Sequence, residues 1–177
     1  MKKIGLVVAL LVASVTATFA QQIAYVDAEY VSKHIPEYVN AQKQLDELST
    51  KWQNDVDNQF AQIEKLYQAY QNDQELLNED MRRRREDEIV NKEKEVKEYQ
   101  RQKFGFEGEL FQQRTRLIDP IQAKVSKAIK DVATAKGLDL ILDKADEGSF
   151  LYANPKLDIS NEIVTKLGLK PNPALAN

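Results

Sequence analysis

The chain has 177 residues, a formal net charge of −3, a single histidine and no cysteine. The lack of cysteine excludes disulfides, thiolate metal sites and cysteine nucleophiles. An acidic chain is a poor match for sequence-independent nucleic-acid binding, which needs dense Lys and Arg side chains to neutralise phosphates, so no nucleic-acid partner is expected.

The first twenty residues have the pattern of an export signal. A basic start, Met1-Lys2-Lys3, precedes an apolar run at residues 4–17 and a small residue, Ala20, at the expected cleavage point. The run is short for a membrane span, although a retained anchor is the alternative. We expect residues 1–20 to be removed, which takes away two lysines and no acid and leaves a net charge of −5.

The middle of the chain has the composition of a long helical arm. Residues 37–104 contain no glycine and no proline, and good helix formers dominate them. Apolar residues recur three or four positions apart, which predicts a helix with one apolar stripe. A single rod and an antiparallel hairpin both fit this period. Polar residues at 71–74 and a helix-capping residue, Asn78, favour a hairpin that bends between residues 72 and 79.

Five aromatic side chains along the predicted arm are candidates for contact with a bound protein. Most are expected in the seam between the two arm helices, but the charged returning helix is too polar to cover the whole apolar stripe. Exposed apolar surface bordered by charge marks a place where a partner binds. The candidates are Trp52, Phe60, Tyr67, Tyr70 and Tyr99.

The returning half of the arm is rich in charges that pair along the helix. Acids precede bases by four residues at Glu79–Arg83, Asp80–Arg84, Glu88–Lys92 and Glu93–Lys97. One basic block, Arg82, Arg83, Arg84 and Arg85, lies near the predicted tip. The favoured interpretation is a solvated face neutralised by neighbouring acids. The alternative is an attraction for anionic lipid headgroups or for acidic loops of a bound protein.

The segment FGFEGELF at residues 104–111 predicts an interruption of the helix at the root of the arm. Two glycines, Gly105 and Gly108, alternate with the aromatic residues Phe104 and Phe106. Such a break is either a mobile hinge or a fixed kink packed by its aromatic rings.

The two ends of the chain predict a small body of short strands and helices. Residues 22–27 predict a strand and 28–34 a helix. Downstream, Asp119-Pro120 has the form of a helix start, and a helix closed by Gly137 should follow. Strands are expected at 138–143 and 149–153 around a turn, and a last helix should begin at Asp158 or Ser160 and run to Leu167.

These elements divide the chain into four segments: the signal at 1–20, a body built from 21–44 and 109–170, the arm at 45–108 and a flexible tail at 171–177. A body of about ninety residues buries little surface alone, so oligomerisation is expected. The residues predicted to form the body core or the contacts between subunits are Ile23, Tyr25, Ile121, Val125, Ile129, Leu140, Leu142 and Leu151.

Motifs for catalysis are missing from the sequence. The single histidine, His34, is expected on the surface. An acidic turn with Asp143, Asp146 and Glu147 lacks the spacing of a calcium-binding EF-hand loop, and nothing predicts a cleft around Glu107 and Glu109. We therefore expect no enzyme activity, no cofactor and no metal.

Several stretches together resemble the OmpH/Skp family of periplasmic chaperones, in the form common in Bacteroidetes. They include IAYVDAEYV at 23–31, MRRRREDEIVNKEKEV at 81–96, FGFEGELF at 104–111 and LDLILDK at 138–144. The resemblance spans essentially the whole mature chain. It implies an α+β, mostly α fold, with a small β-containing trimerisation body and a long antiparallel helical-hairpin (coiled-coil) arm, assembled as a homotrimer.

The resemblance also implies a function, namely a holdase that keeps unfolded outer-membrane proteins soluble in the periplasm without ATP. The best-known members are strongly basic, whereas residues 46–112 hold 17 acids and 11 bases here. Hydrophobic contact is therefore expected to carry more of the binding than charge. The alternative is a structural or scaffolding coiled-coil protein of the cell envelope that binds no client.

Overall fold

The computed structural model describes residues 22–144 and 152–175, and these form a mostly helical chain with one two-stranded sheet. This confirms the predicted α+β class with a long helical hairpin. Internal contacts divide the described chain into an arm unit, residues 32–124, and a body unit, residues 22–31 and 125–175. Each unit is described by itself below.

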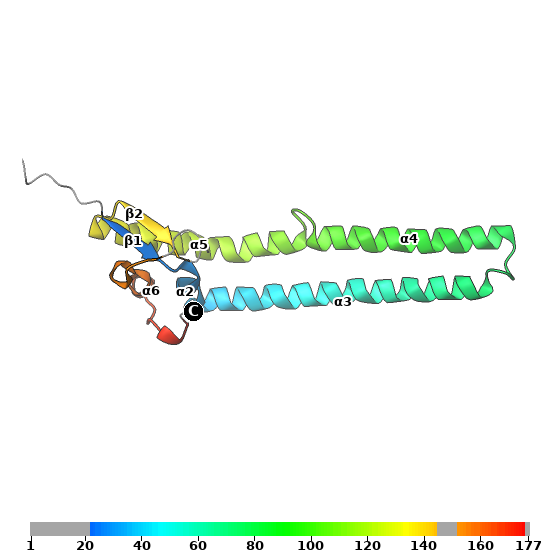
Figure 1. Ribbon diagram of the computed structural model, residues 1–177, viewed down its shortest axis with the longest axis horizontal. Coiled ribbons are helices and arrows are strands. Elements are labelled where there is room, and N and C mark those ends of the chain that lie inside the picture. The colour runs from blue at the N-terminus through cyan, green and yellow to red at the C-terminus, as the bar shows by residue number, and fades with distance from the viewer. Residues whose placement is uncertain (1–21, 145–151, 176–177) are drawn as a thin grey trace, which may run out of the picture. The chain divides into compact units, whose positions relative to one another are not determined.

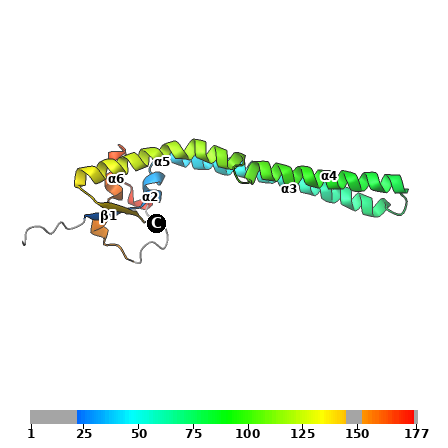
Figure 2. The same ribbon diagram turned by 90° about the horizontal axis from the view of Figure 1, so that it is seen from above.

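The arm unit is built on two long antiparallel helices. Helix α3 (Pro36–Asp73) and helix α4 (Glu79–Phe104) lie side by side in both Figure 1 and Figure 2. The turn between them ends at Asn78, whose side chain accepts a hydrogen bond of 2.9 Å from the backbone N–H of Met81. This N-cap satisfies a donor that the helix itself cannot use. The predicted hairpin and its capping residue are confirmed, and the single rod is excluded.

A narrow apolar seam holds α3 and α4 together. Its buried members are seven residues apart on each helix, Val56 and Ile63 on α3 and Ile89 and Val96 on α4. A seven-residue spacing returns side chains to the same face of a helix, as in coiled coils. Both valines are only 2% exposed, so the seam is closed along its middle. Partly buried residues packed against it are Leu66, Tyr70, Tyr99 and Phe104.

The body unit contains a parallel sheet of two short strands. Strand β1 (Ile23–Val26) pairs with strand β2 (Leu140–Asp143), in a register that places Ile23 opposite Leu140 and Tyr25 opposite Leu142. Parallel strands need a long crossover connection, which the intervening chain provides. The other elements of the described body are α2 (Ala28–Lys33), the C-terminal part of α5 (Glu109–Lys136), η2 (Pro155–Leu157), α6 (Ser160–Lys166) and η3 (Pro173–Leu175).

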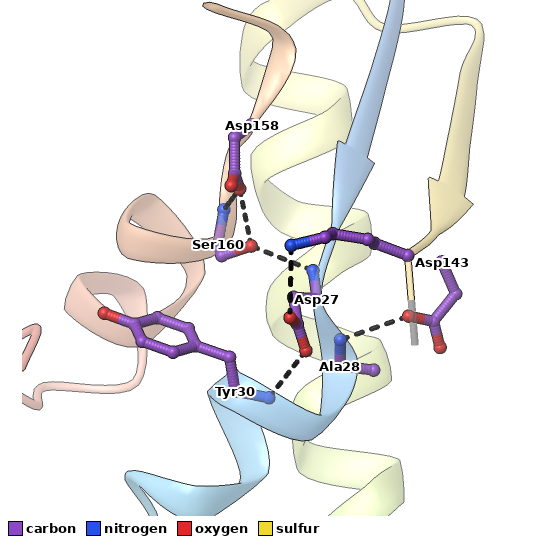
Figure 3. A network of polar contacts seen from close by, with 7 residues as sticks. Asp27, Ala28, Tyr30, Asp143, Asp158 and Ser160 are labelled. Atoms are coloured by element: carbon purple, nitrogen blue, oxygen red, sulfur yellow. Dashed lines mark hydrogen bonds and ion pairs between the residues drawn. The ribbon is translucent and has the colours of Figure 1, made fainter. Parts of the chain in front are cut away.

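A network of polar contacts joins the strands to the short helices of the body (Figure 3). Asp27 caps α2, because its carboxylate accepts a 2.8 Å hydrogen bond from the backbone N–H of Tyr30. The Ser160 hydroxyl accepts from the Asp27 N–H at 2.8 Å and donates to Asp158. Asp143, at the end of β2, accepts from the N–H of Ala28 at 3.1 Å. The ends of β1 and β2 and the starts of α2 and α6 are thus fixed to one another.

Two predictions for the downstream elements need correction. Helix α5 begins at Glu109 and runs through Pro120, although Asp119-Pro120 was predicted to start a helix. Pro120 lies on the exposed side of α5, where water can satisfy the carbonyl that loses its N–H partner. The cost of a proline inside a helix, about 3 kcal/mol, is offset by an apolar face that stays buried on both sides of it, at Ile118, Ile121, Val125 and Ala128.

The second correction concerns the strand predicted at 149–153. Tyr152 and Ala153 are not in a strand, and residues 149–151 lie outside the described residues, as do the acidic residues Asp146 and Glu147 of the preceding turn. The other short elements agree with prediction: β1, α2 and α6 lie within one residue of their expected bounds. Of the two residues predicted for the start of α6, Ser160 is the first residue of the helix. The Asp158 carboxylate accepts a hydrogen bond of 2.8 Å from the backbone N–H of Ser160.

The predicted core residues separate into two groups. Tyr25, Ile121 and Val125 are buried, and Ile129 is half-buried. Ile23, Leu140 and Leu142 are 39–49% exposed, so they are not part of the core of the single chain. Leu151 lies outside the described residues.

Candidate functional site

The arm carries its aromatic side chains in two different environments. Trp52 is buried on α3 and meets Phe104, the last residue of α4, edge to face with ring centroids 6.2 Å apart. The Lys103 ammonium lies 5.0 Å from the Trp52 ring centroid and 5.3 Å from that of Tyr99. Such cation–π contacts stabilise by about 0.5–2 kcal/mol. This cluster holds α3 and α4 together and offers little surface to a partner.

Tyr99 and Tyr70 are likewise engaged within the arm. The Tyr99 hydroxyl donates a 3.0 Å hydrogen bond to the Asp55 carboxylate on α3. Burial raises the pKa of the Tyr99 phenol, and the Asp55 carboxylate adds to the rise. The Tyr70 hydroxyl donates to Glu86 on α4, and this hydrogen bond raises the pKa of Tyr70. Three of the five aromatic candidates therefore tie the two arm helices to each other.

Phe60 and Tyr67 are the two candidates that remain accessible. Their side chains are 41% and 47% exposed, and they lie seven residues apart on α3, which places them on the same face of the helix. On α4, the large apolar residues Met81 and Val90 are 48% and 45% exposed. The arm thus combines a closed seam with apolar surface outside it, as predicted from the polarity of the returning helix.

The four arginines near the tip differ in their contacts. The Arg82 guanidinium donates to the backbone carbonyl of Leu77 in the turn, at 3.1 Å. Arg83 pairs with Glu79 at 3.4 Å and Arg85 pairs with Glu88 at 3.6 Å, both on exposed surface. Arg84 makes no ion pair with any residue that the structure describes. Most of this basic block is therefore used inside the arm.

A four-residue loop interrupts the returning side of the arm between α4 and α5, visible as a bulge in Figure 1. The N–H of Gly105 donates to the carbonyl of Arg101 at 2.8 Å, and that of Gly108 donates to the carbonyl of Gly105 at 2.9 Å. Across the loop, Lys103 pairs with Glu109 at 2.6 Å. These contacts favour a fixed kink over a mobile hinge.

The body unit exposes an apolar face on its sheet. Cα partners of a parallel pair point their side chains to the same side, so Ile23, Tyr25, Leu140 and Leu142 share one face. Tyr25 is buried, whereas Ile23, Leu140 and Leu142 are exposed in the single chain. β2 pairs with β1 alone within the described chain, which leaves its outer edge open.

Sequence reasoning missed Lys103 and Asp55. Lys103 was one of many charges on a polar helix, and Asp55 one of many on α3. Their importance comes from the register of α3 against α4, which places each of them beside an aromatic ring. The pair Lys103 and Glu109, on either side of two glycines, was the signal that could have indicated a closed loop.

Other kinds of site are not found in the described residues. Nowhere in residues 22–144 and 152–175 do three or more His, Asp or Glu side chains gather as a metal site would require. No helix within these same ranges is long and apolar enough to cross a membrane. Asp143 is used as a hydrogen-bond acceptor for Ala28.

Comparisons with known proteins agree with this architecture. Residues 22–167 match the model of a family described as outer membrane protein (OmpH-like). No curated protein matches the chain. Among solved structures, the chain is similar to that of a candidate outer membrane chaperone (OmpH-like) from Caulobacter crescentus, with a TM-score of 0.62 and 11% sequence identity over 84% of each chain. At this identity, the likeness shows a shared fold.

Proposed function

Because this chain belongs to the OmpH-like outer membrane protein family, we propose that it is a holdase chaperone that binds unfolded outer-membrane β-barrel proteins. The proposed location is the periplasm, reached through the signal-like residues 1–20. The proposed activity is passive and uses no ATP, because it consists of keeping apolar segments of a client from one another. Family membership and the shared fold support a chaperone role.

The observation that carries the proposal is the exposure of Phe60 and Tyr67 on one face of α3. A fully exposed aromatic side chain offers roughly 150–250 Å² for burial, and Phe60 and Tyr67, at 41% and 47% exposure, keep roughly 60–120 Å² of it. At about 25 cal/mol per Å², each ring gives a contact of a few kcal/mol at most, before the entropic costs of binding. A row of such weak contacts suits an unfolded chain with no fixed shape. The acidic balance of the arm gives no electrostatic attraction for an acidic client.

We further propose that the chain acts as a homotrimer formed through its body. Support comes from the exposed apolar residues Ile23, Leu140 and Leu142 and from the outer edge of β2, which no strand of the described residues pairs with, since exposed strand edges are usually covered or paired. Light scattering on the mature protein measures the mass of the assembly. A stable monomer at micromolar concentration would contradict the trimer, and Leu140→Glu with Leu142→Glu should shift a trimer towards monomers.

Contact of the arginine block with anionic lipid headgroups would rest on Arg84 alone, because the neighbouring arginines have partners within the arm, and it is not part of the proposed function.

An aggregation assay tests the central proposal. A denatured outer-membrane β-barrel protein is diluted from urea, with and without the mature chain, and its light scattering is followed. We expect near-stoichiometric amounts to suppress scattering, with no effect of added ATP. If scattering is unchanged at every ratio, the chaperone proposal is wrong, and a scaffolding coiled-coil role becomes the better interpretation.

A further inference from the structure

The loop at residues 105–108 presents Phe106, whose side chain is 96% exposed. No other large apolar side chain in the described residues is as exposed. We propose that Phe106 is a dedicated contact for an extended apolar segment of a bound unfolded polypeptide. This inference rests on the proposed function and assigns a part of it to a loop that the aromatic stripe of α3 does not include.

The position of Phe106 is determined by the backbone of the loop. A Cβ atom on Gly105 would lie 2.3 Å from the Arg101 carbonyl oxygen, and one on Gly108 would lie 2.9 Å from the Gln102 oxygen. Only glycine fits such close approaches of backbone to backbone. Glu107 adopts a φ of +56°, which is uncommon for a residue with a side chain. The loop therefore has a specific shape, and that shape holds the ring away from the arm.

Folding of the chain gains nothing from an aromatic ring at this position. Phe104, two residues earlier, packs against Trp52, whereas Phe106 is almost wholly in water. A polar residue at 106 would preserve the loop hydrogen bonds, because these are made by backbone atoms. The ring therefore fits a contact with something outside the chain.

The surroundings of Phe106 indicate the chemistry of that contact. A shallow hollow beside the ring is lined by the polar side chains of Glu98, Arg101, Gln102, Glu107 and Gln112. Arg101 and Gln102 both donate to Glu98, which lowers the pKa of that carboxyl and keeps it charged. The Glu107 carboxylate forms no ion pair with a described residue. Carboxylate oxygens beside an apolar ring suit an extended polypeptide, which offers backbone N–H donors next to apolar side chains.

The same features argue against other occupants. One ring offers roughly 150–250 Å² and the side chains that line the hollow beside it are polar, so this place lacks the apolar patch that an interface of ~800 Å² per partner between two folded copies needs. The Glu107 carboxylate, which forms no ion pair with a described residue, repels an anionic membrane surface and acidic peptide segments, whereas the charge of Glu98 is balanced by Arg101. A flexible, uncharged or basic segment remains, and it gains from many such small contacts.

A unique cysteine makes a direct test simple, because the chain has none of its own. Phe106→Cys is labelled with an environment-sensitive fluorophore, and a denatured outer-membrane β-barrel protein is added from urea. We expect a blue shift on binding. The matched control is Tyr152→Cys, labelled in the same way. Tyr152 is an aromatic residue of the body unit that is 81% exposed, and a label there should show no blue shift. Equal shifts at both positions, or none at 106, would overturn the proposal.

Affinity provides the second measurement. Phe106→Ser is expected to weaken binding of the same fluorescent client about three- to tenfold, with the melting temperature and the assembly mass unchanged. An unchanged dissociation constant in a protein that still holds the client soluble would remove Phe106 from the site and leave the proposed function standing. A change in assembly mass would instead assign the ring to self-association. Failure of the wild-type chain to hold any client would reject both proposals.

Discussion

The Phe104 ring stands nearly perpendicular to the Trp52 ring, at an angle of 82° with centroids 6.2 Å apart. Phe104 is the last residue of α4, and Trp52 lies within the uninterrupted helix α3. The returning side of the arm is therefore fixed to α3 at the point where its own helix stops. Lys103 strengthens this joint by pairing with Glu109 beyond the loop.

Loss of the Phe104 ring should weaken the arm measurably. We expect Phe104→Ala to lower the free energy of unfolding by about 2–3 kcal/mol, somewhat below a fully buried Phe→Ala because Phe104 is half-buried. Trp52 is the only tryptophan, so its fluorescence in a urea titration reports on this joint directly. Phe111→Ala is the control, since Phe111 is 53% exposed and should cost less than half as much. Equal losses would contradict the packing argument.

The loop after α4 should require glycine at position 105, because a side chain there would collide with the backbone. Gly105→Ala places a methyl group against the Arg101 carbonyl, so we expect a loss of about 2–3 kcal/mol or a shortened α4. Gly137 is the matched control: it has a positive φ of 66°, but no atom lies within 4 Å of the place that a methyl group would take, so Gly137→Ala should cost only about 1 kcal/mol. Urea titrations of both variants compare the two effects. A neutral Gly105→Ala would show that the loop adapts easily.

The exposed aromatic pair on α3 should carry part of the client affinity. Phe60→Ser together with Tyr67→Ser is expected to weaken client binding about fivefold or more, because two apolar contacts are lost. Helix content by circular dichroism should stay constant, since neither residue is in the seam. Gln62→Ser with Gln68→Ser changes two exposed polar residues of the same helix and serves as the control. Similar losses in both double variants would indicate a general effect on the helix.

The arginine block should not bind anionic membranes at physiological salt. Three of the four arginines have partners in the arm, and the arm is acidic as a whole. We expect no co-sedimentation with phosphatidylglycerol vesicles at about 150 mM salt, where the Debye length is about 8 Å. Binding that disappears in Arg84→Gln, while the stability stays the same, would support contact with lipid headgroups instead.

Alkaline pH should loosen the arm through Tyr99. The raised pKa of its phenol means that the folded arm favours the protonated form, as burial and the Asp55 carboxylate both require. The stabilisation is fully present below the unfolded pKa of about 10 and is lost as pH rises through the folded value. We expect the free energy of unfolding to fall above pH 10, and to fall less in Tyr99→Phe. Absorbance at the phenolate band gives an independent titration, and a curve identical in both proteins would contradict this assignment.

Sequence patterns predicted the long elements well because each of them is determined locally. A glycine-free, proline-free run with a heptad-like stripe strongly favours helix, and Asn78 with its following acids marks the start of α4 within the chain itself. Pro120 shows where local rules fail. Its preference for a first helical turn is overridden by an apolar face that continues from Ile118 to Ala128, and such burial depends on tertiary structure.

Side-chain roles within the arm depended on information that the sequence does not carry. Five aromatic residues were predicted, but the split into seam and surface follows from the register of α3 against α4. A different register would bring other side chains into contact across the seam. In the body, the alternation of Leu140 and Leu142 suggested a core, yet a two-stranded sheet has too few neighbours to cover that face.

The parallel pairing of β1 with β2 has a consequence for how the chain matures. The backbone N–H of Gln22, just before β1, donates to the Asp139 carboxylate 117 residues later. Contacts of such high sequence separation form slowly, because loop closure must precede them. In a chain that is synthesised from its N-terminus, β1 emerges early and has no strand partner until β2 has followed. The helical hairpin is made of local contacts and can form before β2 is available. A folded hairpin leaves less flexible chain between β1 and β2, which lowers the entropic cost of pairing the two strands.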